Sequence, residues 1–253
     1  AMTAFQDGNK DYGLNCGLSY TGKFVYRPIN NKTTSLHIGA AASYRMPKTS
    51  STDGYNAVRY STRNTTGVNR KKFMDTDAIQ YLDHEFAYTF ELAGHHKGLR
   101  WEAAYIARKP FVDEAKWTEK NGEAPNMQQA WGWYVQAGYL LFGGSQNYDA
   151  GGAKYTRTNN GREWGDIELC ARVEYLDLNI SKYVMGGSAY AYSLGLNFHV
   201  TRNVKFQINY QYNDQDVFAN GKGAQDGTDK TAKKPYSTGY DADGNVCAYP
   251  GDI

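Results

Sequence analysis

Period-two alternation of apolar and polar residues is the feature that most restricts how this chain can fold. Two such runs lie in the stretch AYSLGLNFHVTRNVKFQINYQY, residues 191–212, and only residues 201–203 separate them. Alternation predicts strands with one apolar and one polar face, because successive side chains of a strand point to opposite sides. The function of the chain depends on which face meets the rest of the protein.

The same pattern extends along most of the 253 residues. We predict eight strands, at residues 13–27, 35–46, 83–94, 99–108, 130–142, 165–178, 191–200 and 204–212. The composition agrees with this prediction, because 22 Tyr and 27 Gly residues favour strands and turns over helices. The sequence therefore predicts an all-β protein.

Charge and cysteine content argue against several classes of protein. The net charge of +2 is too small to indicate a nucleic-acid partner. Cys16, Cys170 and Cys247 lack the spacing of a metal site, and an odd number of cysteines cannot form a closed disulfide framework. No apolar run approaches the roughly 20 residues of a membrane helix. For a β-barrel this last observation carries little weight, because barrel strands are half polar.

Alternation alone leaves two architectures open. In a soluble β-sandwich the apolar faces pack on one another, whereas in a membrane barrel they contact lipid. Strands of ten to fifteen residues are long for a sandwich, but they suit a tilted membrane crossing of about 9 to 11 residues. Short turns also alternate with long polar connections, with residues 143–164 as a Gly-rich exception on the short side. Up-and-down strands with segregated short and long connections are typical of outer-membrane barrels.

Aromatic residues of the apolar faces fall at two levels. The larger set is predicted near the long loops: Tyr44, Phe86, Tyr88, Tyr105, Trp131, Trp133, Tyr175, Tyr190, Tyr192, Tyr210 and Tyr212. A smaller set is predicted near the short turns: Phe24, Tyr26, Trp101 and Phe198. Aromatic rings are favoured where acyl chains meet headgroups, so this sorting favours the membrane barrel. The polar faces then line an aqueous lumen, where charged side chains avoid the cost of burial in an apolar core.

Six segments, taken in order, resemble a known family. They are LHIGAAASYRMP; VRYSTRNT followed by FMDTD; LDHEFAYTFELAGHHKGLRWEAAYI; GWYVQAGYLLFGGSQNYD; WGDIELCARVEYLDLN; and GGSAYAYSLGLNFHVTRNVKFQINY. Together they resemble the phosphate-selective porins O and P over most of residues 11–213. The resemblance implies a 16-stranded outer-membrane barrel, commonly a homotrimer, that passes small anions.

The resemblance also implies that the chain is part of a larger barrel. It places residues 1–253 in the C-terminal half of the family's barrel, as a single partial porin domain. About eight antiparallel, up-and-down transmembrane strands are expected within residues 13–213, and a long polar loop at residues 214–253. The chain starts without a signal peptide and ends without a final amphipathic strand, so we expect a fragment.

For a porin the decisive chemistry is the charge of the polar faces. The predicted pore-lining residues are Lys23, Arg27, Arg45, Glu91, Arg100, Glu102, Arg108, Glu168, Arg172, Glu174 and Lys205. With Asp83, Glu85 and Asp166 added, seven acidic residues balance seven basic ones, so this wall by itself forms no anion funnel. Arg100 and Arg172 are the candidates for anion contact, because a guanidinium binds phosphate in bidentate fashion.

A structural role is the alternative for the same arginines. In that interpretation Arg172 pairs with Glu168 or Glu174, and Arg100 pairs with Glu102, in a network that stiffens the wall.

Metal chemistry has little support. Gly244 in YDADGNV is misplaced for a calcium loop, and the adjacent His95 and His96 suit one metal ion poorly.

No arrangement of Ser, His and Asp or of Cys and His has a turn context that supports a nucleophile. We therefore predict a passive channel of the outer membrane rather than an enzyme, with no cofactor and no metal. Its predicted partners are outer-membrane lipid and small anionic or polar solutes. Two alternatives remain open: a soluble all-β module that binds a ligand or carbohydrate, and an adhesion role for the loops at residues 47–81 and 214–253.

Overall fold

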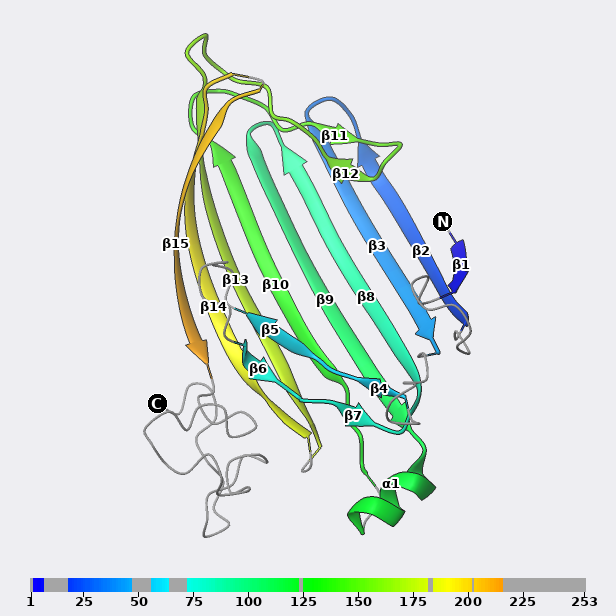
Figure 1. The fold of residues 1–253 in the computed structure, drawn as a ribbon. Helices are drawn as coiled ribbons and strands as arrows, with labels where there is room; N and C mark the ends of the chain where they lie inside the picture. The colour runs from blue at the N-terminus through cyan, green and yellow to red at the C-terminus, as the bar shows by residue number, and fades with distance from the viewer. Residues whose placement is uncertain are drawn as a thin grey trace, which may run out of the picture.

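Nine antiparallel strands form one large curved sheet, which dominates the fold (Figure 1). The structure, a computed structural model, describes residues 2–6, 18–46, 56–63, 72–122, 125–181, 184–201 and 203–215. In their order across the sheet the strands are β1 (Met2–Gln6), β2 (Leu18–Asn30), β3 (Thr34–Arg45), β8 (Leu82–His96), β9 (Leu99–Val112), β10 (Ala130–Leu140), β13 (Asp166–Ser181), β14 (Val184–His199) and β15 (Lys205–Gln215). Because the order in the sheet is the order in the chain, the fold is the predicted all-β, up-and-down arrangement.

The eight predicted strands are present, but several of their ends differ. β13 continues to Ser181 and β14 begins at Val184, so the predicted strand ends at residues 178 and 191 are wrong. β1 was not predicted, and it pairs with β2 in the register Met2↔Gly22. The predicted C-terminal loop starts later than residue 214, because β15 reaches Gln215. Residues 13–17 of the first predicted strand and residues 216–253 lie outside the described residues.

The long connection between β3 and β8 folds over the polar face of the sheet. Its described residues, 56–63 and 72–80, are called the inner loop below. They contain β4 (Ala57–Val58), β5 (Ser61–Arg63), β6 (Lys72–Asp75) and β7 (Ile79–Gln80), which pair as β4 with β7 and β5 with β6. Figure 1 shows β5 and β6 in front of the large sheet, and β6 contacts β14. The sequence predicted only a long polar loop here.

A short helix, α1 (Glu114–Asn121), follows β9 in another connection that was expected to be irregular. The Asp113 side chain caps its first turn by accepting a hydrogen bond from the Lys116 N–H at 3.2 Å. Gly122 ends the helix with a positive φ of 83°, a conformation that glycine adopts at little cost. Alternation of period two cannot reveal an eight-residue helix, which explains why the prediction missed it.

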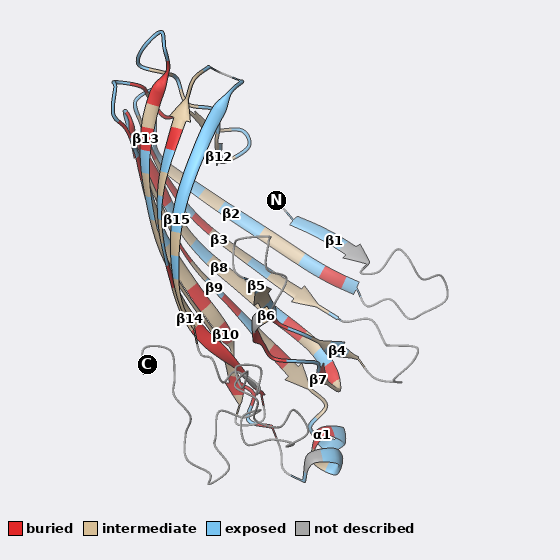
Figure 2. Ribbon diagram, turned by 60° about the vertical axis from the view of Figure 1, so that its left-hand side comes forward, coloured by how far each residue is buried: buried red, intermediate tan, exposed pale blue. Residues whose placement is uncertain are grey.

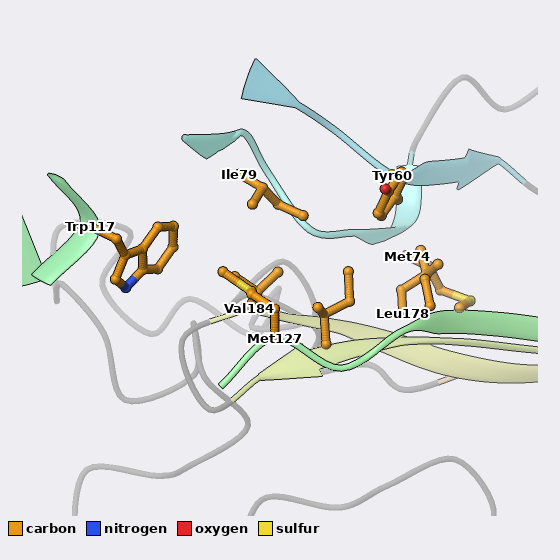
Figure 3. Packing of buried hydrophobic residues seen from close by; sticks show 9 residues of the cluster. Tyr60, Met74, Ile79, Trp117, Met127, Leu178 and Val184 are labelled. Carbon is orange, nitrogen blue, oxygen red and sulfur yellow. The ribbon is translucent and has the colours of Figure 1, made fainter. Parts of the chain in front are cut away.

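A small apolar core lies beneath the inner loop, at the long-loop end of the sheet. Figure 3 shows its labelled members: Tyr60, Met74, Ile79, Trp117, Met127, Leu178 and Val184. Its position explains a change of phase in β13. Tyr175 and the apolar residues before it occupy odd positions, whereas Leu178 and Ile180 are even-numbered and fully packed in this core. The polar face therefore carries apolar side chains at this end of β13, where the inner loop packs on it.

The opposite face of the sheet exposes large apolar side chains on almost every long strand. Phe24 is 70% exposed and Ile208 is 74% exposed, and Figure 2 shows β15 exposed along most of its length. Soluble proteins rarely leave an apolar surface of this extent uncovered. Within the described part of the chain no second sheet packs on this face, which a soluble sandwich would require.

The aromatic side chains of this outer face form two groups, as the two-level prediction requires. The larger group runs across five strands from ring to ring: Tyr88, Tyr105, Trp131, Tyr175 and Tyr190, with centroid separations of 6.2, 6.0, 5.1 and 4.6 Å. At the opposite end Trp164 lies 5.0 Å from Phe142 and 6.1 Å from Phe198. Trp164 comes from a predicted loop and was missing from the expected lower group.

The helices of the part of the chain that the structure describes were compared with the length and hydropathy of a membrane-spanning segment. None of its helices has both the length and the apolar character of a transmembrane segment.

Replacement of Gly132 by Ala should destabilise the sheet. A Cβ at this position would lie 2.6 Å from the Tyr175 carbonyl oxygen on β13, so the two backbones would have to separate. We expect a loss of about 1–3 kcal/mol in the free energy of unfolding, measured by denaturant titration of the refolded full-length protein. Gly22→Ala on β2 is the matched control, because a Cβ there meets no atom within 4 Å. Equal stability of the two variants would contradict this packing.

Candidate functional site

Strand register collects the predicted pore-lining residues on one face of the sheet. Glu102 is directly opposite Gln136, which is opposite Arg172 on the next strand. Residues that are directly opposite each other on neighbouring strands share a face of the sheet. The strand pairing places ten of the predicted residues on the polar face, and the contact of Arg27 with Ala150 places the eleventh there. The eleven residues are Lys23, Arg27, Arg45, Glu91, Arg100, Glu102, Arg108, Glu168, Arg172, Glu174 and Lys205. The face divides into four clusters, three of them centred on one glutamate.

The first cluster surrounds Glu85 beneath the inner loop. Its carboxylate lies 3.3 Å from Arg108 Nη1 and 3.8 Å from Arg45 Nη1. Tyr60 of the inner loop donates its hydroxyl to Glu85 Oε2 at 2.6 Å. Burial and the neighbouring carboxylate raise the pKa of Tyr60 far above its ordinary value, so the hydroxyl keeps the proton that it donates. Glu85 thereby joins the inner loop to the wall.

The second cluster surrounds Glu91 near the other end of the sheet. Glu91 Oε1 lies 2.5 Å from Lys23 Nζ and 2.9 Å from His37 Nε2. The second ring nitrogen of His37 lies 2.5 Å from the hydroxyl of Tyr148, which belongs to the connection between β10 and β13. Gly39 makes room for this carboxylate, because a Cβ there would lie 2.3 Å from Glu91 Oε1.

The third cluster contains Arg172, one of the two candidates for anion contact. Its guanidinium donates to Glu174 Oε2 at 2.7 Å and to Gln136 Oε1 at 2.8 Å. It also lies 4.0 Å above the centre of the Tyr134 ring, a cation–π geometry. Arg172 therefore pairs with Glu174, one of the two predicted partners. Glu102 accepts hydrogen bonds from Tyr134 and Gln136 instead of pairing with an arginine.

The fourth cluster surrounds Glu168 and corrects the partner predicted for Arg100. Arg100 Nη2 lies 3.7 Å from Glu168 Oε1, whereas the prediction paired Arg100 with Glu102. Gln146 and Asn197 donate to the same carboxylate, each at 3.0 Å. The reason lies in Gly138, which is opposite Arg100 on β9 and leaves space for Glu168, because a Cβ there would lie 2.6 Å from Glu168 Oε1. Spacing along one strand could not show this contact.

Burial removes three of the seven acidic side chains of the wall from solvent. The side chains of Glu85 and Glu168 are each only 3% exposed, and Asp166 is also buried. Glu91 and Glu174 stay partly accessible at 25% and 28%, close to Arg100 at 29%, whereas Arg108 is 45% exposed. The formal balance of charges is therefore not the balance that a solute on this face would meet.

The connection between β10 and β13 also folds onto the polar face, from the turn end of the sheet. It spans residues 141–165 and carries β11 (Tyr148–Asp149) and β12 (Lys154–Tyr155), and Figure 1 shows both strands crossing the sheet near its upper edge. Arg27 donates to the Ala150 carbonyl, and Arg100 lies 5.5 Å from the centre of the Tyr155 ring. Burial raises the pKa of Tyr155 to about 12, so its ring stays uncharged beside the arginine.

Asp166, at the start of β13, anchors this connection. Its Oδ1 accepts from the Phe142 and Ile167 N–H groups at 3.0 and 2.8 Å, and its Oδ2 accepts from Gly144 and Gly161 at 2.8 and 3.0 Å. Four backbone donors thus converge on one buried carboxylate. A carboxylate is suited to this position because both of its oxygens accept hydrogen bonds.

Several contributors to the polar face were absent from the predicted set. They are Arg59, Tyr60, Arg63, Gln146, Tyr148 and Tyr155, and all come from the two connections that fold inward. The one feature of the sequence that could have indicated an inward-folding connection was the length of the segment 143–164, which is long for the end of the sheet that otherwise has short turns. Among the described residues no three His, Cys, Asp or Glu side chains are grouped as a metal ion would need.

A two-faced sheet with an exposed apolar surface and a charged opposite surface defines the class of porin-like outer-membrane proteins. Comparison with known proteins gives the family. The profile described as phosphate-selective porin O and P matches residues 1–232. The chain therefore belongs to the phosphate-selective porin O and P family, whose members are outer-membrane porins, and it is a protein of the outer membrane.

Two relatives show how much of a family member the chain represents. A protein of Caulobacter vibrioides is 30% identical over 207 residues, which cover 81% of this chain and 38% of that protein. Porin O of Pseudomonas aeruginosa is 25% identical over 224 residues, which cover 80% of this chain and 49% of Porin O. The chain thus spans less than half the length of these relatives. Its place in the C-terminal half of such a barrel stays a prediction.

Asp166→Asn should loosen the connection at residues 141–165. An amide has one acceptor oxygen in place of two, so at least one pair of backbone N–H groups loses its partner. An unsatisfied group costs about 1–3 kcal/mol, which corresponds to amide exchange roughly ten to a hundred times faster. Hydrogen exchange followed by mass spectrometry measures this rate. Asp149→Asn is the control, because Asp149 accepts from a single backbone donor, Gly151, in an exposed turn; equal exchange in both variants would rule the anchor out.

Proposed function

We propose that this chain forms part of the wall of a water-filled channel through which small solutes diffuse passively across the outer membrane. The observation that carries the proposal is the opposite character of the two faces of one sheet. Residues such as Phe24 and Ile208 expose apolar surface on one side, while charged clusters extend from β2 to β15 on the other. Charged groups of this density are stable in a wide aqueous lumen and costly in lipid.

We infer further that the channel prefers anions, with phosphate as the solute class that the family description names. The support is electrostatic. Glu85, Asp166 and Glu168 are buried, so their charges position neighbouring groups and are shielded from passing ions. The guanidinium groups of Arg108 and Arg172 are partly exposed to the lumen side. A wall of this kind gives permeating anions contact with cations more readily than with carboxylates.

Lipid and further copies of the protein are the proposed partners of the outer face. Its aromatic residues fall at two levels, a distribution that suits the two interfaces of a membrane. A homotrimer of the full-length protein is the proposed assembly, since the family resemblance implies it and the outer face offers extensive apolar surface. Chemical cross-linking of the full-length protein in native membranes would give a trimer band if this is right and a monomer band alone if it is wrong.

Planar-bilayer recording of the full-length protein tests the channel and its selectivity together. Stepwise conductance is expected, and its absence would contradict the channel function. Arg172→Glu should lower the ratio of anion to cation permeability about fivefold. That estimate corresponds to roughly 1 kcal/mol in the ratio, from about 0.5 kcal/mol of opposite sign for anion and cation when two charges change about 8 Å away in water at about 0.1 M salt. The measurement is the reversal potential in a gradient of potassium chloride.

Lys32→Glu provides the matched control for Arg172→Glu. It makes the same change of charge, but Lys32 is exposed in the turn between β2 and β3. We expect a much smaller change in reversal potential, because the charge lies away from the wall clusters. If Arg172→Glu leaves the reversal potential unchanged, Arg172 is a structural residue of the wall and does not select ions.

A further inference from the structure

A cavity of about 520 Å³ lies between the inner loop and the polar face of the sheet. Tyr60 and Met74 belong to its inner-loop side, and residues of β9, β10, β13, β14 and β15 form the opposite side. Volumes between about 300 and 1,000 Å³ are typical of sites for small organic ligands. The cavity is open on one side, so a solute in the lumen can enter it.

One row of the sheet gives this cavity an apolar floor. Ile106 is opposite Gly132, Gly132 is opposite Leu176, and Leu176 is opposite Ala189. Leu176 lies across the glycine, since a Cβ on Gly132 would come within 3.2 Å of Leu176 Cδ1. Ile106 remains 42% exposed although it is on the polar face. A continuous band without polar side chains thus crosses four strands at the bottom of the cavity.

The rim of the cavity is cationic. Arg59, Arg63, Arg108 and Arg172 contribute to its lining, and Glu174 is the one carboxylate among the described lining residues. Two of these arginines each have a buried carboxylate partner outside the cavity lining: Asp75 holds Arg59, and Glu85 holds Arg108. Arg59 also lies 3.3 Å from the exposed Asp77 carboxylate. The hydrogen bonds fix the positions of the guanidinium groups while leaving part of each accessible. Arg59 and Arg108 have side-chain exposures of 44% and 45%.

We propose that this cavity binds small organic anions with a compact apolar body, of which an aromatic carboxylate is the simplest example. The apolar body would lie on Ile106 and Leu176, and the anionic group would contact the guanidinium of Arg108 or Arg172. This inference rests on the proposed channel function and names a class of solute that the channel retains. The cavity would distinguish such solutes from inorganic phosphate, because only they have an apolar part that can contact its floor.

The floor is the reason for this distinction. Inorganic phosphate presents only oxygen atoms, so it gains nothing from the apolar row and must give up hydration to approach it. A phenyl ring gains from leaving water there, roughly in proportion to the area that it buries. Arginines on the rim attract both ions. The apolar row is therefore the feature of the cavity that favours the aromatic carboxylate over phosphate.

The test uses the full-length protein in planar bilayers with benzoate and inorganic phosphate as probes. Each is added at increasing concentration, and the reduction of the chloride current gives a half-blocking concentration. Benzoate is expected to block at a concentration at least tenfold lower than phosphate. Ile106→Asn should raise the value for benzoate about tenfold and leave that for phosphate within about twofold, because it replaces part of the floor with an amide.

Val25→Asn is the matched control for Ile106→Asn. Val25 is a β-branched residue on the same face, opposite Gly39, and it lies outside the cavity. It should leave both half-blocking concentrations unchanged. Arg63→Gln should weaken both probes, since Arg63 contributes only charge to the rim. Leu176→Ala, which shortens the floor without adding a polar group, repeats the test should Ile106→Asn fail to fold.

Two results would overturn the inference: benzoate that blocks no better than phosphate, or an Ile106→Asn variant that changes both probes equally. Calorimetric titration of the detergent-solubilised protein with benzoate gives a second readout that does not depend on current. Failure of the proposed channel function can be distinguished from failure of the cavity inference, because the protein would then give no stepwise conductance. If calorimetry then still detected benzoate binding, and Ile106→Asn weakened it, the result would support the proposed binding site in the cavity.

Discussion

The register between neighbouring strands is the constraint on which the rest of this structure depends. Side chains alternate between the two faces, so a slip of one residue would exchange the apolar face with the charged one. Glu91 opposite Gly39 and Gln136 opposite Arg172 show how closely the side chains follow this register. The glycine leaves space for the carboxylate, and the glutamine accepts from the guanidinium. Backbone pairing and side-chain chemistry therefore specify the same alignment.

Buried carboxylates connect the sheet to the segments that fold over it. Glu85 accepts from Tyr60 of the inner loop, Glu168 accepts from Gln146, and Asp166 collects four backbone N–H groups. Each of these acids lies on a strand, and each holds a connection that enters the polar side from one end. Their charge is compensated by arginines or hydrogen bonds, as a buried charge requires. The arginines that pair with Glu85 and Glu168 stay more accessible than these two acids, and this is the physical basis of the proposed preference for anions.

Much of the fold could be predicted because strand alternation is a local property of the sequence. The eight long strands and the two levels of aromatic residues follow from it, and Trp131 and Tyr175 lie in the group expected for them. The inner loop could not be predicted in the same way. Leu178 and Ile180 break the phase of β13, and the sequence offers no reason for the break until Tyr60 and Met74 are seen above them.

The sequence by itself determined the class of fold, the family and the two faces of the sheet, since each depends on residue type and spacing. Only the tertiary structure decided which charges meet. Arg100 reaches Glu168 across the sheet, and the inner loop forms a cavity over Ile106 and Leu176. These contacts join residues that are far apart in the chain, and their geometry depends on strand register and on where the long connections fold. Both are set by packing over the whole sheet, which no local pattern of residues encodes.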